Sequence, residues 1–226
     1  MTRYSSHLQQ DQATEDSRQI PAAPCPGKPH NCKLLLIGHA LGAVLLDASV
    51  RVSVFQPDGD ERPSVMVVMR PPGEPPAVPQ RLASVAYERP VAHIKHAGTF
   101  GQFWHGRAAG RAGFDDALLT GPGGVTTEGA ITNIGFFDGT SVTWPGAPAL
   151  AGITMQPVTV ALARRGTPSR HGTVRLADLP SFRAVFVTNS LDVAPVSQVD
   201  DYVLPADPVF SRTLAEAYEA VPWDRI

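Results

Sequence analysis

This chain of 226 residues has few lysines, few cysteines, few long apolar runs and a small net charge. The formal net charge of −2 gives no reason to expect a nucleic acid or an acidic membrane surface as a partner. The most apolar segment, residues 32–47, is interrupted by His39 and closed by Asp47, so it is too short to span a bilayer. Residues 1–19 lack the apolar core of a secretory signal, and we therefore expect a cytoplasmic protein.

The only two cysteines, Cys25 and Cys32, lie close together with His30 between them. One possible pair does not make a disulfide framework in a chain of this length. The spacing is not that of a zinc knuckle and no fourth ligand is evident, so we expect free thiols and no metal site.

Lysine occurs at three positions, Lys28, Lys33 and Lys95, and arginine carries the remaining positive charge. Lys95 stands alone inside RPVAHIKHAG, with no lysine after it. Arginine cannot lose its proton in a protein, whereas lysine can, and a neutral lysine amine is a nucleophile. The alternative is a lysine at a strand end whose stem covers apolar surface. Position alone leaves both readings open.

Periodicity and turn residues predict a mixture of helices and strands after a polar, Pro-rich arm at residues 1–32. Strands are expected in SVRVSVFQ, VMVVMR, RLASVAYER and VAHIKH, and on both sides of the turns at 121–124 and 138–139. Helices are expected at 33–47, 100–114, 154–166 and 207–221, with a short helix and a buried strand across 177–190. This order indicates an α/β or α+β fold rather than a doubly wound sheet.

Four segments, in this order, resemble those of the fold-type IV pyridoxal-phosphate enzymes. They are HIKHAGTF, GGVTTEGAITNIGFFDG, LAGITMQPV and VFVTNSLDVAPV. That group holds branched-chain and D-amino-acid aminotransferases and aminodeoxychorismate lyase. The resemblance covers roughly residues 48–200 and implies the large domain of such an enzyme, at 91–226, preceded by a shortened small domain at 33–90.

The resemblance implies that Lys95 is the catalytic lysine, which attaches pyridoxal 5′-phosphate covalently and then moves the Cα proton. It implies that Glu128 pairs with the pyridine nitrogen of the cofactor, so that the ring acts as an electron sink. A carboxylate at a strand end is the alternative for Glu128. Asn133 is implied as a supporting hydrogen-bond group. If Lys95 lies on a strand, its neighbours His93 and His96 point away from the site.

The resemblance also implies two contacts with the cofactor phosphate. Gly152, Ile153 and Thr154 match the GIT segment, whose backbone amides and hydroxyl bind phosphate at a helix start. A simple Thr cap of the helix has the same pattern. Asn189 and Ser190 match the loop that supplies a second phosphate contact, although such a loop can be only a turn.

Three departures from the family pattern bear on activity. Phe100 occupies the position of a tyrosine that contacts the ring oxygen of the cofactor, and Met155 stands where an arginine often follows GIT. The phosphate-binding arginine of the small domain has no counterpart in the first 47 residues.

We therefore expect an aminotransferase acting on an amino acid and a 2-oxo acid, and working as a homodimer. The alternatives are a lyase of the aminodeoxychorismate type and a degenerate homologue without turnover.

Overall fold

The computed structural model describes residues 48–59, 61–73, 75 and 79–222. The chain divides after Gly73 into two compact units. β3 (Gln80–Ala86), which falls in the range 33–90 predicted for a small domain and linker, lies in the sheet of the second unit. The predicted helix at 33–47, the arm at 1–32 and both cysteines lie outside the described residues.

The described part of the first unit is a hairpin of β1 (Ser49–Phe55) and β2 (Ser64–Arg70), which pair antiparallel from Ser49 opposite Arg70 to Phe55 opposite Ser64. β1 was predicted from its alternating apolar residues, and β2 as the apolar strand after the turn at 57–64.

The second unit is built on one long sheet with the strand order β5-β4-β3-β10-β9-β6-β7-β8, and β11 (Tyr202–Val203) pairs with β10. The remaining strands are β4 (Asp116–Thr120), β5 (Thr126–Gly129), β6 (Asn133–Phe137), β7 (Val142–Pro145), β8 (Ser169–Gly172), β9 (Ala184–Thr188) and β10 (Val193–Val199). β3 runs parallel to both of its neighbours, and β7 runs parallel to β8, whereas the other strand pairs are antiparallel. This is the mixed α/β architecture that the sequence predicts.

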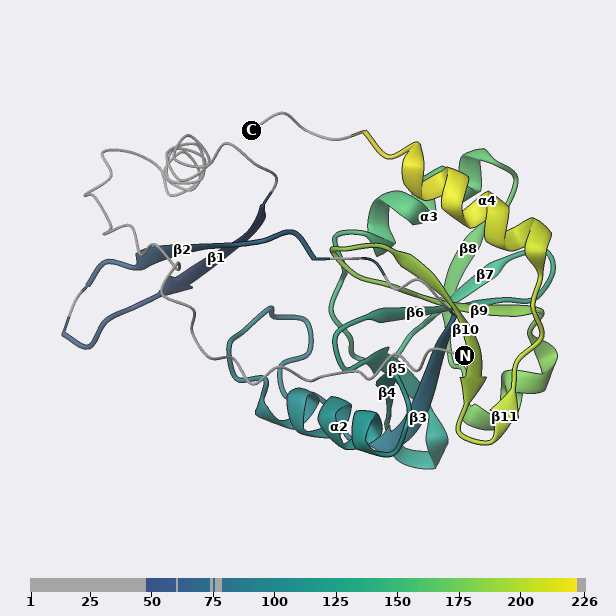
Figure 1. Ribbon diagram of the computed structural model, residues 1–226, viewed down its shortest axis with the longest axis horizontal. Coiled ribbons are helices and arrows are strands. Elements are labelled where there is room, and N and C mark those ends of the chain that lie inside the picture. The colour runs from purple at the N-terminus through teal and green to yellow at the C-terminus, as the bar shows by residue number, and fades with distance from the viewer. Residues whose placement is uncertain (1–47, 60, 74, 76–78, 223–226) are drawn as a thin grey trace, which may run out of the picture. The chain divides into compact units, whose positions relative to one another are not determined.

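The central strands are buried on both faces, which explains their nearly continuous apolar runs. In β9, Val185 and Val187 belong to one core cluster, while Ala184 and Phe186 belong to another. The first cluster lies against the 3₁₀ segment η2 (Leu176–Ser181), and the second lies against α3 (Met155–Arg164) and α4 (Pro208–Glu219). Figure 1 shows α3 and α4 together on one side of the sheet and α2 (Phe100–Arg111) beside β3 and β4.

The turns and caps follow local chemistry. Asp207 caps α4 by accepting a hydrogen bond from the Phe210 N–H at 2.9 Å, as predicted. Asp138 accepts bonds from the N–H groups of Thr140 and Ser141, and Gly139 takes a φ of +107°, which favours glycine. The β6–β7 connection is therefore a four-residue loop that contains the predicted Asp-Gly turn.

Residues 91–96, which were predicted to form a strand, do not form one. Pro90 begins a turn in which Val91 has a φ of +46°, and the Ile94 N–H donates to the Val91 carbonyl at 2.9 Å. This local turn replaces the pairing of a strand, so the alternation argument that turned His93 and His96 away from Lys95 does not hold. His93 is exposed, and His96 Nε2 lies 3.0 Å from the Pro90 carbonyl.

Candidate active site

Glu128 is the buried acid around which the predicted residues gather. It lies near the end of β5, and its side chain is 6% exposed. Its Oε2 accepts a hydrogen bond from the Leu150 N–H at 3.1 Å, and its Oε1 lies 3.2 Å from Arg89 Nε. The contact with Arg89 is an ion pair whose geometry is not that of a hydrogen bond, since neither atom has a hydrogen-bond partner in the described part of the chain. One carboxylate oxygen therefore remains able to accept a hydrogen bond.

Arg89 is the site residue that sequence reasoning missed. Its side chain is 2% exposed, and it donates to the carbonyl of Ala92, so it also fixes the start of the lysine segment. A fully buried arginine needs an anion beside it, and Glu128 supplies that anion. The one available signal was its place directly before Pro90, six residues before Lys95.

Burial raises the pKa of Glu128, because a desolvated carboxylate is harder to ionise. The Leu150 N–H and the positive charges of Arg89 and Lys95 act in the opposite direction and lower this pKa. No hydrogen bond or ion pair joins Lys95 to Glu128 among the described residues, so its charge acts on Glu128 only from a distance. Lys95 itself is exposed in an irregular segment just before α2.

Asn133 and Glu128 hold the same peptide segment. Asn133 Nδ2 donates to the Leu150 carbonyl at 2.7 Å, while the Leu150 N–H donates to Glu128. Two buried side chains from β5 and β6 thus fix residue 150 on both of its backbone groups. The bond from Asn133 holds the backbone, and the role of Asn133 toward a cofactor stays a prediction.

Gly152 follows two residues later and lies directly against Asn133. A Cβ atom at residue 152 would lie 1.9 Å from Asn133 Oδ1, so a larger residue would displace the amide. The absence of a side chain at Gly152 lets the chain enter α3 beside the site.

Thr154 begins α3 but does not cap it through its side chain. Its hydroxyl instead donates to the Asn189 carbonyl at 2.5 Å. The alternative of a simple helix cap is therefore wrong. The bond joins the start of α3 to the β9–β10 turn, the two segments predicted to bind phosphate, and the first N–H groups of a helix are free of intrahelical partners.

Asn189 organises that turn. Its Oδ1 accepts hydrogen bonds from the N–H groups of Leu191 at 2.8 Å and Asp192 at 3.3 Å. Ser190 beside it is exposed, as is Ile153 on the facing segment, so both can meet a ligand from solvent.

The structure thus forms two groups: Glu128, Asn133 and Gly152 around Leu150, and Thr154 bonded to Asn189. Lys95 is related to the first group only by its charge. Phe100, which replaces the family tyrosine, is 79% exposed at the start of α2.

No group of three or more His, Cys, Asp or Glu residues in the described part of the chain could hold a metal ion. Among the same residues, no helix has the length and apolar character needed to cross a membrane.

Comparisons with known proteins agree on one family. The model of the family described as amino-transferase class IV matches residues 32–199. None of the curated proteins compared with the chain matches it.

Three similar solved structures illustrate the fold. A hypothetical aminotransferase from Mycobacterium tuberculosis in a PLP-bound form is 18% identical, with a TM-score of 0.75 over 87% of this chain and 77% of that one. A fold IV transaminase from Curtobacterium pusillum is 22% identical, with a TM-score of 0.71 over 84% and 72% of the two chains. A branched-chain aminotransferase from the thermophilic archaeon Thermoproteus uzoniensis is 21% identical, with a TM-score of 0.73 over 84% and 69%.

Proposed function

Because the chain belongs to the class IV aminotransferase family, we propose that it binds pyridoxal 5′-phosphate and transfers an amino group between an amino acid and a 2-oxo acid. The observation that carries the proposal is the buried Glu128, with one oxygen free to accept a hydrogen bond and with the charge of Lys95 acting on it from a distance. Neighbouring structures add support, since one is described as bound to PLP and another as bound to alpha-ketoglutarate and PMP.

The residues fit the cofactor at three points. Glu128 Oε1 can accept from a protonated pyridine nitrogen, and Lys95 is exposed and able to reach an aldehyde. The start of α3 and the β9–β10 turn, joined by Thr154 and Asn189, offer backbone N–H groups and polar side chains to a phosphate.

When bound, the cofactor would supply an electron sink for the Cα carbanion. The other tasks belong to this chain. Lys95 Nζ would hold the cofactor covalently through its aldehyde carbon, with loss of water, and would then move the proton to and from Cα. Glu128 would pair with the protonated pyridine nitrogen. Burial raises the pKa of Glu128, while the Leu150 N–H and Arg89 favour its ionised form. Asn133 holds Leu150 in place for that purpose.

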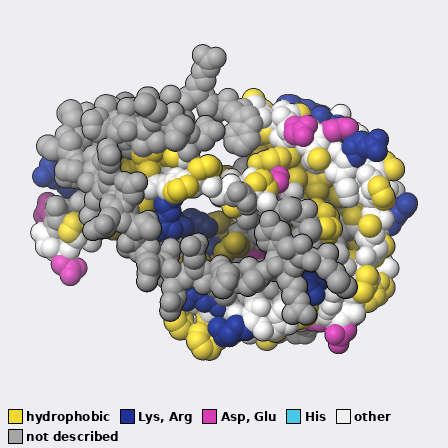
Figure 2. Space-filling view, in the orientation of Figure 1, with side chains coloured by type: hydrophobic (Ala, Val, Ile, Leu, Met, Phe, Trp, Pro, Cys, Tyr) yellow, Lys and Arg dark blue, Asp and Glu magenta, His cyan; other side chains and the backbone are white. Residues whose placement is uncertain are grey.

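We also propose that the protein forms a homodimer. α2 exposes Phe100, Phe103 and Trp104 at 79%, 51% and 54%, and Phe100 stacks on Trp104 with ring centroids 6.1 Å apart. Hydrophobic and basic side chains lie side by side over α2 in Figure 2, whereas charged side chains gather over α4. An exposed aromatic face supports a homodimer.

Because the chain contains only three lysines, an experiment can identify which of them binds the cofactor. The purified protein, incubated with pyridoxal phosphate, should absorb in the visible, and borohydride should fix the cofactor to one of only three lysines. We expect the modified peptide to contain Lys95. Lys95→Arg should remain folded by circular dichroism and lose covalent attachment, because arginine is not a nucleophile. Attachment at Lys28 or Lys33 alone would remove Lys95 from this role.

Turnover separates the remaining alternatives. A transaminase converts an amino acid and a 2-oxo acid into a new pair, whereas a lyase of the aminodeoxychorismate type releases its product without a second oxo acid. The substitution of Phe100 for tyrosine favours one further candidate, a homologue that binds the cofactor without turnover. Visible absorbance with neither activity would identify that case.

A further inference from the structure

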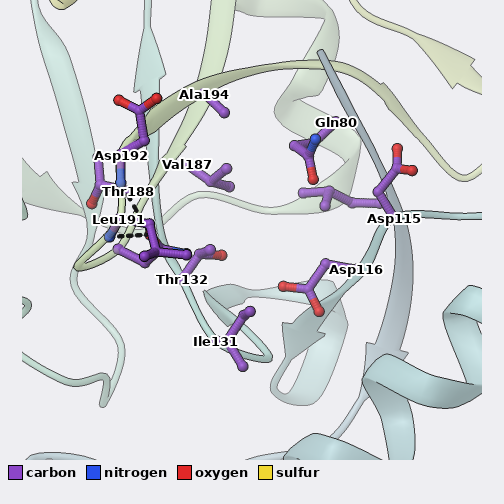
Figure 3. Close-up of a pocket in the computed structure, with 12 residues that line it drawn as sticks. Gln80, Asp115, Asp116, Ile131, Thr132, Val187, Thr188, Leu191, Asp192 and Ala194 are labelled. Carbon is purple, nitrogen blue, oxygen red and sulfur yellow. Dashed lines mark hydrogen bonds between the residues drawn. The ribbon is translucent and has the colours of Figure 1, made fainter. Parts of the chain in front are cut away.

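The second unit contains a cavity that neither Lys95 nor Glu128 lines. It has a volume of about 200 Å³ and is lined by residues of β3, β4, the β5–β6 connection and the β9–β10 turn. Figure 3 shows its side chains around a central space, with Asp116 and Thr132 on opposite sides. It shares Asn189, Leu191 and Asp192 with the β9–β10 turn proposed above to bind the cofactor phosphate.

The lining combines apolar walls with polar groups that lack partners. Val187, Ala194, Ile131 and Leu191 supply aliphatic surface. Thr188 is 1% exposed, yet its hydroxyl has no hydrogen-bond partner in the described part of the chain. A buried hydroxyl without a partner is costly, so its place in a cavity wall indicates a missing partner inside the cavity.

Two more atoms share this property. The Thr132 hydroxyl and Asp116 Oδ2 are also buried and have no hydrogen-bond partner among the described residues. Gly129 brings them to one place, since a Cβ atom there would lie 2.0 Å from Thr132 Oγ1 and 3.2 Å from Asp116 Oδ2. The cavity thus presents a carboxylate oxygen and two hydroxyls with unused acceptor capacity.

The charge of the lining is one-sided. Three carboxylates face the cavity, those of Asp115, Asp116 and Asp192, and none of the lining residues is Lys, Arg or His. Asp115 is compensated by Arg81, whose backbone N–H donates to its Oδ2 at 2.7 Å and whose Nε lies 3.9 Å away. Asp192 accepts from the Val193 N–H. Asp116 Oδ1 accepts from the Ala117 N–H at 2.8 Å. Asp116 Oδ2 makes no hydrogen bond to a described residue, although the backbone N–H groups of Ile131 and Ala130 lie near enough to lower the pKa of this carboxyl.

We propose that this cavity is a binding site for a small alkylammonium ion. A primary ammonium carries three N–H donors, one each for Asp116 Oδ2, Thr132 Oγ1 and Thr188 Oγ1. The aliphatic side chains face the alkyl part of the ligand. A single water molecule occupies only about 30 Å³ in the liquid, so one water does not fill the space. Ile131 and Leu191 are 58% and 44% exposed, so the rim opens to solvent.

Three molecules of one shape test the proposal: tert-butylammonium, tert-butanol and pivalate. Each is titrated into the full-length protein while the amide resonances of Ala117, Thr188 and Leu191 are followed by NMR. The visible spectrum is recorded in parallel, so that any reaction of the amine with pyridoxal phosphate is seen separately. We expect saturable shifts with the ammonium ion, at least tenfold weaker binding of the alcohol, and none of the carboxylate.

Two variants locate the ion. Asp116→Asn should weaken ammonium binding at least tenfold, and Thr188→Val should weaken it several-fold while preserving shape. Asp201→Asn, at an exposed turn outside the cavity, should change nothing. Equal binding of alcohol and ammonium, unchanged binding in Asp116→Asn, or no saturable shift with any probe would overturn the proposal.

Discussion

At the scale of single residues, Glu128 combines burial with three neighbours that oppose its protonation. Glu128→Gln keeps the shape but cannot carry the charge that holds a pyridine nitrogen protonated. We expect cofactor to remain bound and turnover to fall roughly 100-fold, the scale of losing one electrostatic stabiliser. Steady-state rates with saturating cofactor measure this.

Arg89 complicates that variant, because the substitution leaves a buried arginine without its anion. A melting curve is therefore needed beside the rates, with the exposed Glu88→Gln as the matched control. Wild-type turnover in a folded Glu128→Gln protein would make Glu128 a purely structural acid.

Asp116 predicts a dependence of stability on pH. Burial raises its pKa from 3.8 to about 6, more than the backbone N–H groups of Ala117, Ile131 and Ala130 lower it. The folded protein therefore binds this proton more tightly than the unfolded chain, and its contribution to stability falls as pH rises from about 4 through 6.

Asp116→Asn removes the ionised form. The free energy of unfolding of the variant should exceed that of wild type by roughly 3 kcal/mol at pH 7, at 1.36 kcal/mol per pKa unit, and should match it near pH 4. Urea unfolding at the two pH values measures the difference. A gap of the same size at pH 4 would mean that ionisation is not its cause.

At the scale of elements, β6 depends on Gly135. A Cβ atom there would lie 2.4 Å from Phe186 Cζ and 3.0 Å from Trp144 Cζ3, both on buried rings. Gly135→Ala should destabilise the protein by about 1–3 kcal/mol, the usual cost of overpacking a core. Urea unfolding midpoints measure it.

Gly110 is the matched control, because a Cβ atom there would meet nothing within 4 Å in α2. Gly110→Ala should stabilise by about 0.5–1 kcal/mol through helix propensity. Equal effects of the two substitutions would show that the close approach of Phe186 and Trp144 does not matter.

The elements also show where sequence patterns succeed. β4 was predicted from its place before a Gly-rich turn and β9 as a buried strand, and Asp207 marked the start of α4. The strand predicted at 91–96 was wrong, because alternation alone does not reveal that Pro90 and the buried ion pair of Arg89 impose a turn. β8, with the sequence SRHG, and β10, which contains Pro195, form strands because neighbouring strands offer hydrogen bonds.

The residues of the candidate active site could likewise be predicted only in part from the sequence. Resemblance supplied Lys95, Glu128, Asn133, Gly152 and Thr154, and the structure brings Glu128, Asn133 and Gly152 together around Leu150. Leu150 was not predicted, because its backbone acts and no side-chain pattern records this. The cytoplasmic location stays a prediction.

At the scale of the whole molecule, the exposed aromatic face of α2 predicts self-association. We expect a homodimer by light scattering at micromolar concentration. Trp104→Glu should shift the protein toward monomer, since a buried charge without a partner opposes the contact.

Val209→Glu is the control for that experiment, because Val209 is 76% exposed on α4, away from the aromatic face. It should leave the assembly unchanged. A wild-type protein that is monomeric with and without pyridoxal phosphate would refute the dimer.

The two hydrogen bonds at Leu150 set a rule for which changes the segment between β7 and α3 can absorb. Glu128 accepts a hydrogen bond from the Leu150 N–H, and Asn133 donates one to the Leu150 carbonyl. Neither bond involves the side chain of Leu150. Many amino acids can therefore replace leucine, but proline, which has no N–H, removes one of the two bonds. A single-residue insertion or deletion between Pro145 and Gly152 would present the wrong peptide group to both. Position 150 should therefore tolerate many different side chains but no change in the number of residues in the segment. Position 128 should instead require the glutamate side chain.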